Sequence, residues 1–124
     1  MKLSLDTGSA SYRISHYDRA GITINEAVYT HDLIVMPEAL VADWASAPVA
    51  ELTVEHFAAL DERDCEILLL GTGRDQRFPP ARLMADLGRR GIGLEVMDTA
   101  AACRTYNVLM SEDRRVAAAL MMLD

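Results

Sequence analysis

The sequence contains few of the residues on which disulfide-bonded and metal-binding proteins depend. Its two cysteines, Cys65 and Cys103, have no CxxC spacing and are too few for a four-cysteine metal site. We expect both to be reduced and partly buried. The three histidines (His16, His31 and His56) show no pairing at helical or strand spacing. The sequence therefore predicts no metal site and no cofactor.

A long hydrophobic run is also missing. The longest apolar segment falls far short of the ~20 residues that a helix needs to cross a bilayer. The N-terminus has no continuous apolar segment after Lys2, so no signal peptide is visible. We expect a cytoplasmic protein that is not an integral membrane protein.

Basic residues are scarce for a nucleic-acid-binding protein. The net charge is −7, with about −8 in residues 1–66 and +1 in residues 67–124. Affinity for nucleic acid comes largely from the neutralisation of phosphates by cationic side chains, so this balance argues against nucleic acid as a partner. Eleven of the 12 basic residues are arginines, and those of the second half are still able to face a local anionic group.

What the chain does have is enough apolar sequence for a core. With 124 residues, of which 51% are apolar, it is expected to form a single domain over residues 1–124. Its first half predicts strands at 12–17, where apolar and polar residues alternate, at 22–24 with its β-branched residues, and at the apolar segments 27–29 and 33–36. Residues 38–44 fit either a helix or a bent strand.

The second half contains a complete β-α-β unit. The strand at 67–70 is apolar throughout, as is usual for a parallel strand covered on both faces. A helix is predicted from about Pro80 to Arg90, with Leu83, Met84 and Leu87 buried and Gly91 as its stop.

Further elements flank this unit. A short helix after Thr53 precedes the unit, whose second strand is predicted at 93–97, and a helix over 99–111 follows it. Thr99 is the expected cap of this last helix. Residues 116–123 are expected to form an edge or antiparallel strand. The fold class is therefore α/β, with a mixed, mainly parallel central sheet.

A candidate ligand crevice follows from this topology. Ligands in open α/β sheets bind beyond the carboxyl ends of the parallel strands, where a helix N-terminus also offers free N–H groups. That place and those N–H groups suit a small anion or carboxylate. The residues predicted to line the crevice are Gly71, Thr72, Gly73, Asp98, Thr99, Arg104, Thr105 and Asn107.

Each of these residues also has a purely structural interpretation. Gln76 stands where a dinucleotide-binding fingerprint needs its third glycine, and the segment lacks the lysine of a P-loop. The glycines then serve a tight turn, Asp98 pairs with Arg104, and Thr99 caps a helix. No catalytic residue is predicted, because Cys103 has no neighbouring base, although its place near a helix N-terminus favours a lowered pKa.

Several motifs together resemble one known family. They are LLLGTG at 68–73, PP at 79–80, GIGLEVMDT at 91–99, ACRTYNVL at 102–109 and RRVAAAL at 114–120. They resemble the domain-of-unknown-function family with an MTH-like fold that includes mitochondrial complex I assembly factor three and an adipogenesis-associated protein.

The resemblance implies a three-layer fold, in which an N-terminal antiparallel β layer joins helices around the central sheet and residues 38–44 are extended. It also implies action through protein–protein contacts without known catalysis.

Two functional hypotheses remain. In the first, the chain is a non-enzymatic interaction or assembly factor, linked to complex I or to membrane-protein biogenesis. It would then bind an unidentified protein partner through an apolar patch that includes Trp44 or Met121 and Met122. In the second, it is a small-anion-binding protein or an enzyme that uses the crevice around 71–73, 98–99 and 104–107.

Overall fold

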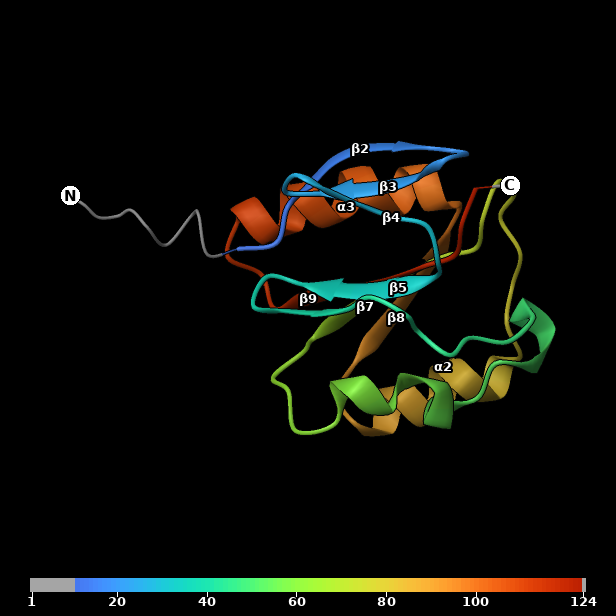
Figure 1. The fold of residues 1–124 in the computed structure, drawn as a ribbon. Helices are drawn as coiled ribbons and strands as arrows, with labels where there is room; N and C mark the ends of the chain where they lie inside the picture. Colours follow the sequence, from blue (N-terminus) through green and yellow to red (C-terminus); the bar gives the residue numbers. More distant parts are fainter. Residues whose placement is uncertain (1–10, 124) are drawn as a thin grey trace.

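A computed structural model describes residues 11–123 of the chain (Figure 1). Its strands are β2 (Ile14–Asp18), β3 (Gly21–Ile24), β4 (Ala27–Tyr29), β5 (Leu33–Met36), β6 (Ala39–Val41), β7 (Ile67–Gly71), β8 (Gly93–Met97) and β9 (Val116–Leu120). Its helices are η1 (Val49–Glu51) and η2 (Val54–Leu60), both of 3₁₀ type, α2 (Ala81–Arg89) and α3 (Thr99–Ser111).

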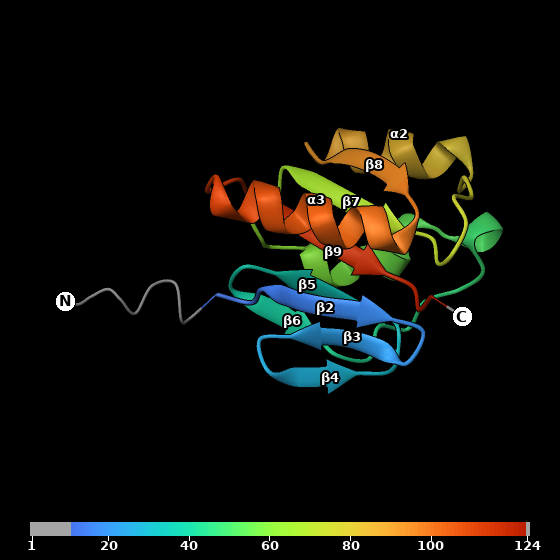
Figure 2. The same cartoon turned by 90° about the horizontal axis from the view of Figure 1, so that it is seen from above.

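The strands form two sheets. An antiparallel sheet has the order β2-β3-β4, and a mixed sheet has the order β6-β5-β9-β7-β8 (Figure 2). In the mixed sheet β7 is parallel to β8 and β9, whereas β5 is antiparallel to β6 and β9. The predicted α/β class and mixed central sheet are confirmed, and the parallel and antiparallel pairings are equal in number.

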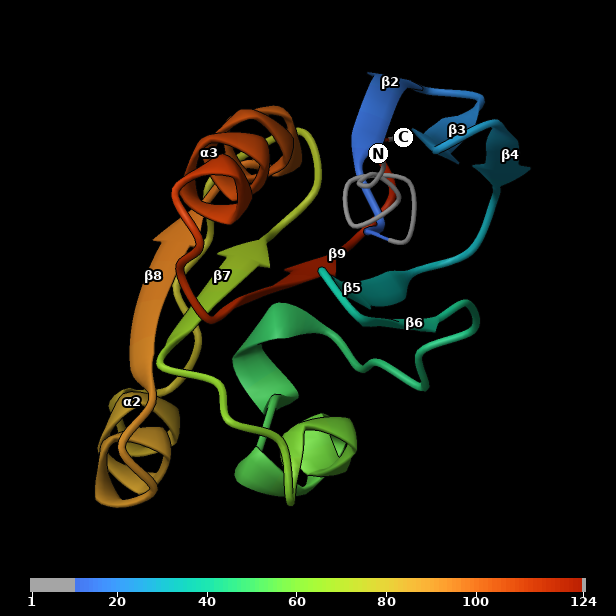
Figure 3. The ribbon, with the colours of Figure 1, turned by 90° about the vertical axis from the view of Figure 1, so that its left-hand side faces the viewer.

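The mixed sheet is the middle of three layers (Figure 3). One face packs against α3 and the β2-β3-β4 sheet, and the other packs against η2 and α2. Alternation within β7 serves both cores, because Leu69 faces α3 while Leu68 and Leu70 face α2. The three-layer arrangement with an N-terminal antiparallel layer is therefore confirmed.

Strand β9 corrects one prediction. Residues 116–123 are expected to form an edge or antiparallel strand; β9 is antiparallel to β5, but it is also parallel to β7 and lies at the centre of the sheet, not at an edge. All five of its residues are buried, with Ala117, Ala118 and Ala119 fully so. Because both faces are covered, the strand has no polar alternation, and its small side chains do not by themselves indicate a central position.

The helices agree with the sequence except in what they bury. Helix α2 ends as predicted, because Gly91 has φ of +80° and Ile92 N–H donates to Leu87 C=O. Met84 was predicted to be buried on α2, but it is 53% exposed. Leu83 and Leu87 are the buried residues of this short helix and form its inward face.

Trp44 belongs to the core and not to a surface patch. It is 5% exposed, its ring lies 5.3 Å from that of Phe57, and its indole N–H donates to His56 C=O over 2.7 Å. The exposed patch proposed around Trp44 is therefore wrong. Residues 39–41 are extended, as the family resemblance implied.

Candidate functional site

The predicted crevice begins where β7 approaches the first turn of α3. A Cβ atom on Gly71 would lie 2.9 Å from Thr99 Cα and 3.1 Å from Ala102 Cβ. Glycine is therefore required here by the contact between the strand and the helix. That contact leaves no room for a ligand between Gly71 and α3.

Thr99 is fully buried and has used its hydrogen-bonding capacity. Its hydroxyl donates to Met121 C=O over 2.6 Å and accepts from Gly73 N–H over 2.8 Å. Its own N–H donates to Gly73 C=O. Thr99 thus joins the ends of β7 and β9 to α3, which favours the structural interpretation of this residue.

Asp98, not Thr99, is the cap of α3. The Asp98 carboxylate accepts from Ala101 N–H over 2.8 Å, whereas Thr99 is already the first helical residue. A carboxylate at this position satisfies an otherwise free N–H and suits the positive end of the helix dipole. The predicted cap at Thr99 is therefore wrong by one residue.

Arg104 and Asn107 lie on the side of α3 that faces the N-terminal sheet. The Asn107 side-chain amide donates to Ile14 C=O over 2.6 Å, and its oxygen accepts from Ile14 N–H over 3.1 Å. Arg104 is exposed, and its guanidinium donates to the Tyr17 hydroxyl over 3.0 Å, not to Asp98. Both side chains hold β2 against α3. Thr105 is half-buried on the same helix, and its side chain forms no hydrogen bond with β2 within the described residues.

Thr72 is the predicted residue that shapes the loop beyond β7. Its hydroxyl donates to Asp75 C=O over 2.6 Å and accepts from Arg77 N–H over 3.0 Å. Thr72 and Gly73 also line a groove of about 850 Å³. Of the eight predicted residues, these two reach the groove, and the remaining six do not line it. Ligand binding by the eight together stays a prediction.

The groove is formed by Asp32, which precedes β5, and by three longer segments that are distant in sequence. They are the loop before η1, the loop from β7 to α2, and the residues that follow β9, and they lie at the right-hand side of Figure 1. The residues that line the groove include Asp32, Pro48, Val49, Arg74, Asp75, Arg77, Phe78, Met121 and Met122. Sequence reasoning identified Met121 and Met122 as a possible patch but missed Arg74, Arg77 and Phe78. An aromatic residue between arginines and two prolines was the available signal.

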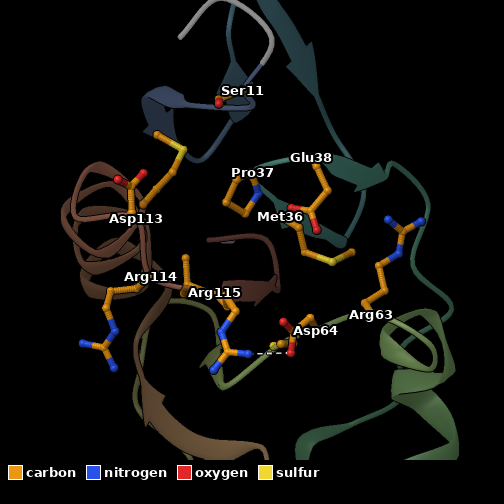
Figure 4. Close-up of a pocket in the computed structure, with 12 residues that line it drawn as sticks. Ser11, Met36, Pro37, Glu38, Arg63, Asp64, Asp113, Arg114 and Arg115 are labelled. Carbon is orange, nitrogen blue, oxygen red and sulfur yellow. Dashed lines mark hydrogen bonds and ion pairs between the residues drawn. The ribbon is translucent and has the colours of Figure 1, made fainter. Parts of the chain in front are cut away.

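A second pocket, of about 300 Å³, lies at the opposite ends of the strands, near the starts of β7 and β9 (Figure 4). Figure 4 shows Arg115 directed toward Asp64 and Arg114 directed away from the pocket. Asp64 and Glu66 both have a lowered pKa. The main cause is a hydrogen bond from Arg115 for Asp64 and one from Arg114 for Glu66. Among the charged residues that line this pocket, Asp64, Arg114 and Arg115 are in ion pairs, whereas Glu38, Arg63 and Asp113 form none within the described residues.

The two cysteine thiols have raised pKa values. Burial raises the pKa of Cys103 to about 12, and burial also raises that of Cys65, whose thiol donates to Ile67 C=O. The predicted lowering of the pKa of Cys103 is therefore wrong, because desolvation outweighs its place near a helix N-terminus. Both thiols are free, as expected.

Two further properties concern residues 11–123 alone. Within this range no cluster of three or more histidine, cysteine, aspartate or glutamate side chains is placed to hold a metal ion. No helix in the same range has the length and apolarity that crossing a membrane requires.

The chain is similar to a longer vertebrate protein and to bacterial proteins of known structure. The chain is 36% identical over 115 residues to the zebrafish NADH dehydrogenase [ubiquinone] 1 alpha subcomplex assembly factor 3, covering 91% of this chain and 66% of that protein. The chain thus spans just under two thirds of that relative's length.

Solved structures give the same fold. A crystal structure from Bordetella parapertussis superposes with a TM-score of 0.84 and 37% identity, covering 91% of this chain and 97% of that one. A solution structure from Bordetella pertussis, described as a Mth938-like domain, gives 0.79 and 34% and covers 98% and 92%. The model of a protein family of unknown function, DUF498/DUF598, matches residues 14–121, and the chain belongs to this family.

Proposed function

We propose that this chain is an assembly factor that acts by binding protein partners, and that its partners belong to respiratory complex I or to the machinery that inserts its membrane subunits. The similarity to assembly factor 3 over 91% of the chain supports the assembly role. The match covers only 66% of assembly factor 3, so the partners and the cellular process of that longer protein are extended to this chain only as part of the proposal.

The observation that carries the proposal is a difference between two sets of side chains near the end of β7. The polar groups expected to recognise a small ligand, above all those of Thr99 and Asn107, are hydrogen-bonded within the fold. The neighbouring groove instead presents an exposed aromatic side chain, Phe78, which is 71% exposed. Aromatic residues and arginine, both present in this groove, are enriched in protein–protein interfaces relative to the rest of the surface.

The raised thiol pKa values agree with this role. A cysteine nucleophile reacts as the thiolate, and a pKa of about 12 keeps the Cys103 thiol protonated near neutral pH. No observation on the described residues favours the alternative, a small-anion-binding protein or enzyme, over protein binding.

The direct test is capture of the tagged protein from its native cells in mild detergent, followed by mass spectrometry against an untagged control. We expect enrichment of complex I subunits or membrane-insertion proteins. A preparation that reproducibly contains neither would contradict the proposal. A thermal-shift screen with small anions provides the opposing test, because stabilisation that is lost in Arg104→Ala would favour the crevice.

A further inference from the structure

The groove beyond β7 has an unusual balance of free and engaged charges. In residues 67–123 six of the eight arginines are engaged by an acid or a hydroxyl: Arg82 and Arg89 by Asp86, Arg90 by Asp61, Arg114 and Arg115 by Glu66, and Arg104 by Tyr17. The other two, Arg74 and Arg77, have no ion pair or side-chain hydrogen bond within the described residues, and both line the groove.

The acidic residues of the groove form no ion pair with these arginines. Asp32 has both oxygens occupied, one by the Ser46 hydroxyl at 2.7 Å and the other by Met122 N–H at 2.9 Å. Asp75 is exposed and forms no ion pair with either arginine. The groove therefore offers two arginines without an ion pair, next to two carboxylates, Asp32 and Asp75, that keep their own negative charge.

Apolar surface lies beside that charge. Phe78 is 71% exposed, and Pro48, Val49 and Met121 line the same groove. Burial of an exposed aromatic side chain on binding removes apolar surface from water, which favours association. Aromatic residues and arginine are the types most enriched among residues that dominate binding energy.

The loop that carries Arg74, Arg77 and Phe78 is held in place before any partner binds. The Thr72 hydroxyl bridges the loop from Asp75 C=O to Arg77 N–H. Gln76, between the two arginines, donates its side-chain amide to Val96 C=O on β8 over 3.0 Å. Prolines at 79 and 80 restrict the backbone after the aromatic residue. Such preorganisation lowers the entropy that a binding surface loses when it is occupied.

We propose that this groove binds an extended segment of a partner protein that carries acidic side chains next to a large apolar one. Arg74 and Arg77 pair with the carboxylates, and Phe78 with the wall formed by Pro48, Val49 and Met121 holds the apolar side chain. The groove is not an enclosed cavity and Phe78 is largely exposed, which suits a chain segment better than a small molecule that is enclosed on most sides. This inference rests on the proposed function, because it specifies the chemistry of the protein partner.

Selection from a library of random short peptides tests this proposal with the intact chain. Peptides selected on the wild-type protein are expected to combine aspartate or glutamate with leucine, isoleucine, phenylalanine or tryptophan. A synthetic peptide of the selected sequence, measured by fluorescence anisotropy, should bind at least about tenfold more weakly to the double variant Arg74→Glu, Arg77→Glu and to Phe78→Ser. Its affinity should also fall as salt is raised.

The matched control is the double variant Arg13→Glu, Arg63→Glu. Both residues are exposed arginines without an ion pair in residues 11–123, and neither lines the groove. The control makes the same change in net charge and is expected to leave peptide binding unchanged. Selection of peptides without acidic residues, or equal binding to wild type and both double variants, would overturn the proposal.

Other occupants of the groove give distinct results. Binding of anionic phosphatidylserine vesicles that depends on Phe78, without peptide selection, would assign the surface to a membrane and overturn the peptide proposal. Self-association in sedimentation that is lost in Arg74→Glu, Arg77→Glu would assign it to a second copy, with the same consequence. If captured complex I proteins bind this double variant as well as the wild type, the assembly function stands and the groove proposal fails.

Discussion

Two neighbouring parts of one loop differ in what their side chains do. Residues 71–73 end β7 and are joined to Thr99 by close packing and by hydrogen bonds. Residues 74–78 continue the same chain, but Arg74, Arg77 and Phe78 project from it without partners in the described structure. The Gly-Thr-Gly motif at 71–73, which is prominent in the sequence, therefore serves the fold. The residues that follow it are the better candidates for binding a partner.

Substitution of Thr99 is the change with the largest expected effect on the first part. Thr99→Val keeps the shape of the side chain but leaves Gly73 N–H and Met121 C=O without their partner in a buried place. Each unsatisfied group costs about 1–3 kcal/mol, so the free energy of unfolding should fall by about 3 kcal/mol. Urea denaturation measures the change.

Thr105→Val is the control for this substitution on the same helix. Thr105 is half-buried and has no side-chain hydrogen bond among those of the described residues. We expect the free energy of unfolding to change by less than about 0.5 kcal/mol. Equal effects of the two substitutions would show that the junction depends on β-branched packing and not on the Thr99 hydroxyl.

Loss of the Asn107 amide should have a smaller and more local effect. Asn107→Ala removes both hydrogen bonds to the Ile14 backbone and should lower the free energy of unfolding by about 2 kcal/mol. The Ile14 amide, at the start of β2, should exchange with solvent faster, while amides of β7 keep their protection. Unchanged protection at Ile14 would contradict the view that Asn107 fixes the N-terminal sheet to α3.

Much of the fold could be predicted from the sequence, because the periodicity of apolar residues indicates which segments form strands and which form helices. The β-α-β unit, its glycines and the turn at Gly91 were predicted from apolar runs and stop signals. The central position of β9 was not, because strand order depends on contacts between segments far apart in the chain.

The site was predicted only in part for a related reason. The sequence shows that Thr99 and Asn107 are polar and near a strand end, but not that the fold uses their hydrogen-bonding groups. In the same way, the sequence does not distinguish paired from unpaired arginines, since their acidic partners come from other elements. Arg90, for example, pairs with Asp61, which precedes β7.

Acidification should weaken the end of the sheet opposite the groove. The pKa of Glu66 lies below its ordinary value of 4.5, mainly because Arg114 donates a hydrogen bond to it. A lowered folded-state pKa stabilises the protein above the unfolded-state pKa, and this stabilisation is lost as the pH falls through the folded-state value. We expect the urea midpoint to decrease below about pH 4.5, and Glu66→Gln to reduce this dependence. An unchanged pH profile in Glu66→Gln would contradict the assignment.

Charge reversal in the second part should have the smallest effect on stability. Arg74 and Arg77 are exposed and form no ion pair within residues 11–123, so Arg74→Glu, Arg77→Glu should change the free energy of unfolding by less than about 0.5 kcal/mol. Thermal and urea unfolding check this value. A loss comparable to that of Thr99→Val would mean that the loop supports the fold, and the comparison between the two parts would fail.

The most direct test of the account measures partner capture by two proteins of equal stability. Wild type and the Arg74→Glu, Arg77→Glu variant, tagged identically and verified as equally folded, are used to capture proteins from native cells, and recovery of complex I or membrane-insertion proteins is quantified. Arg13→Glu, Arg63→Glu provides the control for net charge. The account predicts that only the groove variant loses most of the captured protein. Undiminished recovery with the groove variant would contradict it.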